Sequence, residues 1–190
     1  MKRGLYAALL SATLTSCAPR YAPPPDLPSS VKQISRPEEA QQWLEAVLTY
    51  EHDDKLYGED DFWAPCALTY QLKKGDCEDY AICAAALLDN DIQQGYLIVI
   101  YKPPRPENDK TPDSAHAVFA YKVNDRWGIL SNGRSEYRAP TFSTLYEALR
   151  DSLSYRYNRY EIYDYSGVDI VNGNSSLESK LNKVGGGSLK

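Results

Sequence analysis

One cysteine stands among acidic residues in the stretch KKGDCEDYAICAAALL, which covers residues 73–88. Cys77 lies between Asp76 and Glu78, and Asp79 follows directly. A cysteine in the first turn of a helix is placed where backbone N–H groups and the helix dipole stabilise a thiolate. Nearby carboxylates have the opposite effect, because negative charge raises the pKa of a thiol. The pattern therefore predicts a cysteine nucleophile whose acidic neighbours face another partner.

A cysteine nucleophile needs a base, and the chain offers two histidines, His52 and His116. His52 lies in the acidic segment EHDDK, which is typical of a solvated surface loop. His116 follows a long proline-rich segment and begins the run HAVFAY, which alternates as a strand does. If that strand packs beside the helix of Cys77, the imidazole of His116 can take the proton of the thiol. His116 is therefore the candidate general base.

The N-terminal residues MKRGLYAALLSATLTSC have the layout of an export signal. Two cations precede an apolar run that is too short to span a bilayer, and small residues follow. The last four residues resemble a bacterial lipobox, which predicts a lipoprotein signal peptide over residues 1–16 and lipidation of Cys17. An ordinary secretory signal with a chance cysteine is the alternative.

Lipidation of Cys17 would anchor the mature protein to a bacterial membrane without crossing it. Ala18, rather than an aspartate, follows that cysteine, which favours the outer membrane and a domain that faces the periplasm. Residues 17–30 are rich in proline and predict a stiff linker.

The remaining composition is that of an ordinary globular domain. The chain is 43% hydrophobic with a net charge of −5. Its sequence lacks the stripe of Lys and Arg that would indicate binding to nucleic acid. Residues 31–168 have the length of a single domain. Residues 169–190 are polar and rich in glycine, and we expect a disordered tail there.

Hydrophobic periodicity outlines the elements that must position Cys77 and His116. The predicted helix that starts at Asp76 is apolar around most of its girth, which is typical of a central, buried helix. Helices followed by antiparallel strands predict an α+β fold. The first predicted helix starts near Ser35, and the other three cover residues 62–72, 76–88 and about 144–153. The predicted strands cover residues 96–101, 116–123, 127–130 and 160–165.

Three segments together carry a family resemblance. GDCEDYA, preceded by DFWAPCALTYQLKK and followed by HAVFAYKVNDRWGILSNG, resembles the bacterial transglutaminase-like cysteine proteinases of the transglutaminase/papain-like superfamily. The resemblance covers residues 62–133. It implies N-terminal helices, with the nucleophile on a central helix that packs on an antiparallel sheet.

The resemblance also implies a catalytic triad. Cys77 would be the nucleophile and His116 the general base and later the general acid. Where the family has an orienting aspartate, this chain has Ser131, followed by Asn132. Either side chain can accept the imidazole N–H, as an asparagine does in papain-like proteases. Neither brings a negative charge, so a loss of activity is an open alternative.

Calcium is the cofactor that the resemblance implies. Family members that bind calcium use the acids flanking the nucleophile, which correspond to Asp76 and Glu78. Calcium prefers several oxygen ligands. Capping of the helix N-terminus by the same acids is the alternative and needs no metal. We expect a solvated loop for the other nearby acids, which are Asp53, Asp54, Glu59, Asp60 and Asp61.

Acyl transfer also requires donors for an oxyanion. The backbone N–H of Cys77 is one candidate, and the amide of Gln71 in the preceding segment is another. Cys66 and Cys83 are the remaining thiols of the predicted domain. They could form a disulfide with each other, or Cys83 could be plain buried packing in its helix. We expect plain packing for Cys83.

Three functions are compatible with these residues. The first is a membrane-anchored lipoprotein that hydrolyses peptide bonds of exported proteins, with a protein or peptide as substrate and no nucleic-acid partner. The second is a transglutaminase-like binding module that has lost turnover, which the change to Ser131 favours. The third is an amidase or transpeptidase that acts on peptidoglycan.

Overall fold

The computed structural model describes residues 27–29, 31, 33–102, 115–133, 136–153 and 157–189. The predicted signal peptide and Cys17 lie outside the described residues. Within the described part of the chain, each helix is too short or too polar to cross a bilayer.

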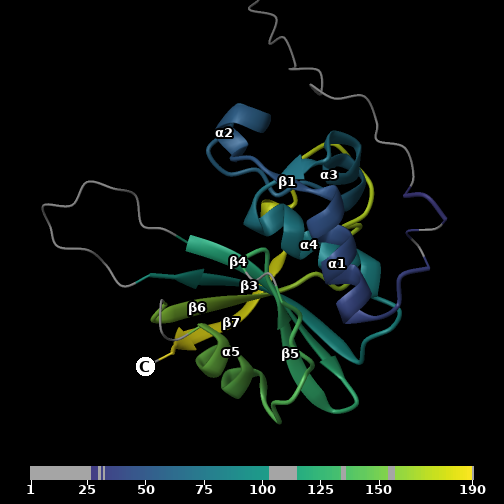
Figure 1. Cartoon of the computed structure of the whole chain (residues 1–190). Coiled ribbons are helices and arrows are strands. Elements are labelled where there is room, and N and C mark those ends of the chain that lie inside the picture. Colours follow the sequence, from purple (N-terminus) through teal and green to yellow (C-terminus); the bar gives the residue numbers. More distant parts are fainter. Residues whose placement is uncertain are drawn as a thin grey trace, which may run out of the picture.

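A five-stranded antiparallel sheet has helical structure on both of its faces (Figure 1). The strand order is β5-β4-β3-β6-β7, and helices α1 to α4 gather on one face while α5 lies on the other. This arrangement confirms the predicted α+β fold. The strands are β3 Gln94–Tyr101, β4 Ala115–Val123, β5 Arg126–Leu130, β6 Arg159–Asp164 and β7 Asn182–Ser188.

The helices agree with the predicted ones in number and order, apart from two short additions, α2 and the 3₁₀ helix η1. Two short strands, β1 Thr49–Tyr50 and β2 Lys74–Gly75, pair in parallel beside them. The predicted helix over residues 62–72 begins only at Cys66, because Pro65 restricts the preceding residue to extended backbone. The helices are α1 Pro37–Val47, α2 Asp53–Leu56, α3 Cys66–Leu72, α4 Cys77–Leu88, α5 Leu145–Leu153 and η1 Glu178–Lys180.

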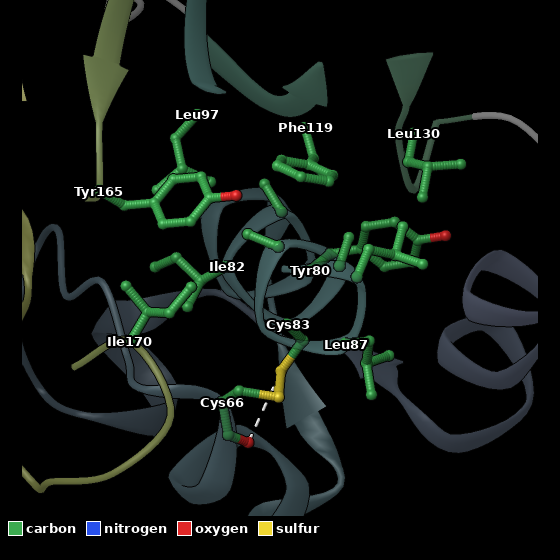
Figure 2. Packing of buried hydrophobic residues seen from close by; sticks show 14 of the residues in the cluster. Cys66, Tyr80, Ile82, Cys83, Leu87, Leu97, Phe119, Leu130, Tyr165 and Ile170 are labelled. Atoms are coloured by element: carbon green, nitrogen blue, oxygen red, sulfur yellow. Dashed lines mark hydrogen bonds between the residues drawn. A yellow bond between two sulfur atoms is a disulfide. The ribbon is translucent and has the colours of Figure 1, made fainter. Parts of the chain in front are cut away.

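Helix α4 is the central helix, as its apolar sequence predicts. Its residues 78–85 are all buried. One side packs on the face of the sheet that carries Leu97, Phe119 and Leu130 (Figure 2). Its alanines allow this close approach, because small side chains leave little between two backbones.

The two faces of the sheet follow the period of two along each strand. In β3 and β4, Leu97 and Phe119 belong to the cluster around α4. Their neighbours Ile98 and Val118 belong to the cluster that includes Leu149 of α5. Each strand therefore contributes to two separate cores.

A disulfide joins Cys66 at the start of α3 to Cys83 in the middle of α4 (Figure 2). The two Cα atoms are 4.6 Å apart, within the range that a disulfide requires. The prediction of plain packing for Cys83 was therefore wrong. The sequence could not decide this point, because the distance depends on how α3 turns back against α4.

The prediction of a disordered tail over residues 169–190 differs from the structure. Ile170, Leu177, Leu181 and Leu189 are buried, and β7 adds a fifth strand beside β6. The backbone N–H of Cys66 donates to the carbonyl of Ile170 at 2.9 Å, so the tail closes over the start of α3. These apolar residues are spaced too widely to give a periodic signal, and they pack in clusters whose other members are distant in sequence.

Candidate active site

The first turn of α4 is held in place by the turn that precedes it. Lys73 ends α3 with a left-handed backbone, φ 56°, and the chain then enters β2. Tyr50 of β1 pairs with Gly75 of β2. Cys77 follows as the first residue of α4 and is partly exposed.

Asp79 anchors this turn from inside. Its side chain is 0% exposed, and its carboxylate accepts the backbone N–H of Ala64 at 2.9 Å and the hydroxyl of Tyr57 at 3.1 Å. A Cβ atom at Gly75 would lie 2.6 Å from Asp79 Oδ2, so only glycine fits there without a shift. Asp79 thus positions this turn, although its place in the sequence does not distinguish it from the other acids around Cys77.

The sulfur of Cys77 is held as a thiol. It donates a hydrogen bond to Glu78 Oε2 at 3.0 Å. Burial raises the pKa of Cys77 above its usual range, and the charge of Glu78 raises it further. The backbone N–H of Ala117 on β4 acts in the opposite direction and lowers that pKa. The sulfur therefore lies against the strand that carries the candidate base.

His116 directly precedes Ala117 on β4. Its Nε2 lies 2.8 Å from the hydroxyl of Ser131, and its ring stacks on Tyr157 with 6.1 Å between centroids. Ser131 is buried, and its Oγ also accepts the backbone N–H of Gly133 at 3.2 Å. The structure thus brings together the imidazole and the residue that stands where an aspartate was expected.

Asn132 and Gln71 are placed differently. Asn132 lines a cavity that Asp76 also lines, beside the first turn of α4. Gln71 is exposed in the last turn of α3, and no contact between it and Cys77 is found within the described residues. A role for Gln71 in binding an oxyanion stays a prediction.

Five acidic side chains converge beside Cys77. Oxygens of Asp53, Asp61 and Glu78 lie within 4.8 Å of one another, and Asp53 and Asp76 meet in a second group with Asp79. Asp53 Oδ1 and Asp76 Oδ1 are buried with no hydrogen-bond partner among the described residues. Buried oxygens without partners, in a set of hard donors, fit a divalent cation such as calcium.

The electrostatics of this acidic cluster reflect crowding. Burial, followed by the charge of Asp76, raises the pKa of Asp53 to about 7. Burial and the neighbouring Asp76 raise the pKa of Glu78 to about 10. Asp53 and Glu78 are therefore harder to ionise than in water, and a bound cation would reverse that effect.

The expectation that the acids of residues 53–61 are solvated was wrong for Asp53. Asp53 is 2% exposed and accepts the backbone N–H of Phe62 through Oδ2. The short helix α2 turns the side chain of Asp53 inward, and a helix of only four residues is too short to be predicted from a periodic pattern. The exposed acids of the segment are Asp54, Glu59, Asp60 and Asp61.

A family model described as a transglutaminase-like domain matches residues 27–163. The chain belongs to this family. The match to the transglutaminase-like domain includes Cys77, His116 and Ser131 and ends within β6, so β7 lies beyond it.

Two solved structures resemble this transglutaminase-like domain. One is LapG of Legionella pneumophila, with 21% identity and a TM-score of 0.35, over 57% of this chain and 56% of that one. The other is an EGTA-treated LapG of the same organism, with 17% identity and a TM-score of 0.40, over 78% of this chain and 73% of that one. The chain thus spans little more than half the length of the first structure. No curated protein sequence matches it.

Proposed function

We propose that this transglutaminase-like domain is a cysteine peptidase with Cys77 as nucleophile and His116 as general base. The observation that carries the proposal is the 2.8 Å contact between His116 Nε2 and Ser131 Oγ. Ser131 stands where the family resemblance places the orienting aspartate, and an orienting hydrogen bond to one nitrogen fixes the role of the other.

The hydrogen bonds of Ser131 define a tautomer of His116. The hydroxyl oxygen has two lone pairs and accepts the backbone N–H of Gly133. In the proposed resting state it also accepts Nε2–H of His116, so Nδ1 is the nitrogen that exchanges a proton with the thiol. The uncharged Ser131 stabilises an imidazolium less than an aspartate would, so we expect slow turnover.

In the proposed reaction, Nδ1 of His116 takes the proton of Cys77, and the sulfur attacks the carbonyl carbon of a peptide bond. The backbone N–H of Cys77, at the start of α4, donates to the oxygen of the tetrahedral intermediate. The imidazolium then gives its proton to the departing amine, which leaves a thioester. Water, deprotonated by His116, hydrolyses the thioester and restores the thiol.

We also propose that Asp53, Asp61, Asp76 and Glu78 hold calcium. The buried oxygens of Asp53 and Asp76, which have no partner among the described residues, and the closeness of the four carboxylates support this assignment. Bound calcium supplies positive charge that offsets the carboxylates around Cys77. Asp79 is occupied by Ala64 and Tyr57, so its task is to position the turn rather than to bind the metal.

The proposed cellular location rests on the pattern of the N-terminal residues alone. We propose that Cys17 is lipidated, that the domain is exported and anchored to the outer membrane facing the periplasm, and that exported proteins are its substrates. A Cys17→Ala variant tests this proposal, because it should shift the protein from the membrane fraction to the soluble fraction. Unchanged membrane association would contradict the anchor.

Alkylation with iodoacetamide, located by mass spectrometry, tests the activation of Cys77. We expect the His116→Ala variant to be alkylated at Cys77 at least about 10-fold more slowly than the wild type near neutral pH. Equal rates would show that the imidazole does not activate the sulfur. The control is His52→Ala, because His52 is the other histidine of the chain, is exposed and takes no part in the proposed proton transfer.

Hydrolysis of fluorescently labelled casein in the presence of calcium tests turnover. Cys77→Ala should abolish it, and Ser131→Ala should lower it by roughly 100-fold, the scale of a lost orienting or general-base contribution. Hydrolysis that persists in Cys77→Ala would contradict the proposal.

A second candidate function is a binding domain that has lost turnover. The uncharged Ser131 beside His116 is the observation that favours it. Ser131→Asp distinguishes the two functions. If this variant hydrolyses casein and the wild type does not, the natural protein is a degenerate enzyme. If both hydrolyse it, the wild type is a working peptidase.

A further inference from the structure

A cavity of about 220 Å³ opens beside the first turn of α4. Gly75 and Asp76, which directly precede Cys77, form one wall, and Asn132, which directly follows Ser131, forms another. The cavity therefore lies between the two segments that carry the proposed nucleophile and the residue that contacts the imidazole. The proposed reaction does not use it.

The inner end of this cavity holds a polar group without a partner. Tyr80 is 3% exposed, and its buried hydroxyl has no hydrogen-bond partner among the described residues. In Figure 2 its ring lies within the apolar cluster, and the hydroxyl points away from that cluster. Buried hydroxyls in folded proteins are nearly always hydrogen-bonded, so this one indicates a ligand or an ordered water.

The charge around the cavity is negative. Glu45 of α1 lines it together with Asp76, and among the described residues no Lys or Arg does. Gln41 donates to Glu45 Oε1 at 2.7 Å and so restricts the position of this carboxylate. Glu45 and Tyr80 line the same cavity, so a group bound there can contact both.

The remaining walls are apolar. Leu44 and Leu48 of α1 supply aliphatic surface, and the exposed ring of Tyr50 stands at the rim. Tyr50 pairs with Gly75, so this rim lies next to the start of α4. The volume is below the range of about 300–1,000 Å³ that is typical of pockets for whole small molecules, so it suits a single side chain.

We propose that this cavity is a specificity pocket for a lysine or arginine side chain of the substrate. The methylene stem lies along Leu44 and Leu48 and the rim of Tyr50. The cationic end reaches Glu45, and the hydroxyl oxygen of Tyr80 accepts one of its N–H groups. That this side chain belongs to a substrate rests on the proposed peptidase function, whereas the binding of a basic side chain in the cavity does not.

Two small probes test the pocket by NMR titration of the full-length protein. They are N-acetyl-lysine methylamide and its norleucine counterpart, which has the same stem without the charge. We expect the lysine probe to bind roughly 10-fold more tightly, the scale of one charge-assisted hydrogen bond. Glu45→Gln should remove this preference and leave the affinity for norleucine unchanged. Tyr80→Phe should reduce the preference by a smaller factor.

Glu39→Gln is the matched control, because Glu39 lies on the same helix but pairs with Arg36 outside the cavity. It should keep the full preference for lysine. Equal affinities of the wild type for the two probes, or an undiminished preference in Glu45→Gln, would overturn the pocket. If Tyr80→Phe does not fold, Glu45→Gln decides alone, since this change keeps the shape of the side chain.

The titration and the casein assay can fail independently. Binding of the lysine probe that depends on Glu45, without any casein hydrolysis, would support the pocket and contradict the peptidase. Hydrolysis that depends on Cys77, with no lysine preference, would contradict the pocket and leave the peptidase in place.

Discussion

The two ends of helix α4 differ in almost every physical respect. The first turn, with Asp76 before it, carries three acids and a thiol, and two of the nearby buried carboxylate oxygens have no partner among the described residues. The rest of the helix, residues 81–88, is apolar and almost entirely buried, and Cys83 ties it to α3.

This difference shows that the apolar end of α4 stabilises the folded domain, whereas the acidic end destabilises it. Burying an apolar side chain is favourable, whereas burying a carboxylate without a partner is costly. The apolar end of α4 must therefore hold the acidic end in place. Substitutions at the two ends should accordingly change the free energy of unfolding in different directions, and calcium should matter at only one of them.

The largest expected effect is at the apolar end. Ile82 is fully buried in the cluster between α4 and the sheet. Ile82→Ala should lower the free energy of unfolding by about 2–5 kcal/mol, because it leaves a cavity that the surrounding side chains fill only partly. Urea denaturation measures this change. Val184→Ala, at a position that is 55% exposed, is the control and should change stability by less than about 0.5 kcal/mol.

The disulfide should contribute somewhat less. It joins residues 17 positions apart, and closing a loop of this size contributes about 3 kcal/mol in the chain-entropy description. The double variant Cys66→Ala/Cys83→Ala should lose about that amount, measured by urea denaturation. A reducing agent should destabilise the wild type but not the double variant. No effect of the reducing agent on the wild type would contradict the importance of this link.

Calcium should stabilise the acidic end. At a calcium concentration 100-fold above the dissociation constant, binding adds about 2.7 kcal/mol to the free energy of unfolding. Asp53→Asn should remove most of this gain, because Asp53 Oδ1 is one of the buried oxygens without a partner. Thermal unfolding with calcium and with EGTA measures it. Asp54→Asn is the matched control, since the neighbouring Asp54 is exposed on the same short helix.

An undiminished stabilisation by calcium in Asp53→Asn would place the metal elsewhere. Equal loss in Asp54→Asn would indicate that the general charge of the loop, rather than the buried cluster, attracts the ion.

The regular parts of this fold could be predicted because local sequence dictates them. The burial of α4 follows from a sequence that is apolar around most of the helix, and the alternation of His116–Val123 follows from the period of 2 residues of a strand. The position of Cys77 at the first turn of α4 followed for the same reason.

The remaining features depend on contacts that are distant in sequence. Asp53 is buried because α2 folds inward, and Ile170 is buried because the tail crosses α3. Asp79 resembled the other acids around Cys77, and only the approach of Ala64 and Tyr57 shows its separate role. Such features have no periodic signal in the residues that carry them.

The smallest expected effect is also the most informative, because its sign should be opposite to that of the changes at the apolar end. Burial raises the pKa of Asp76, which shows that the folded state disfavours its charge. In EGTA, Asp76→Asn should therefore raise the free energy of unfolding by about 1 kcal/mol, since it removes a buried charge and its amide can donate to Glu78. Asp91→Asn, at an exposed position beyond the end of α4, is the control.

With saturating calcium the order of stability should reverse, because the wild type gains from the bound ion and Asp76→Asn loses a ligand. Thermal unfolding of both proteins under both conditions gives the four values that are needed. If Asp76→Asn destabilises the calcium-free protein, the acidic end of α4 is stabilised by its carboxylates after all, and the contrast between the two ends of the helix disappears.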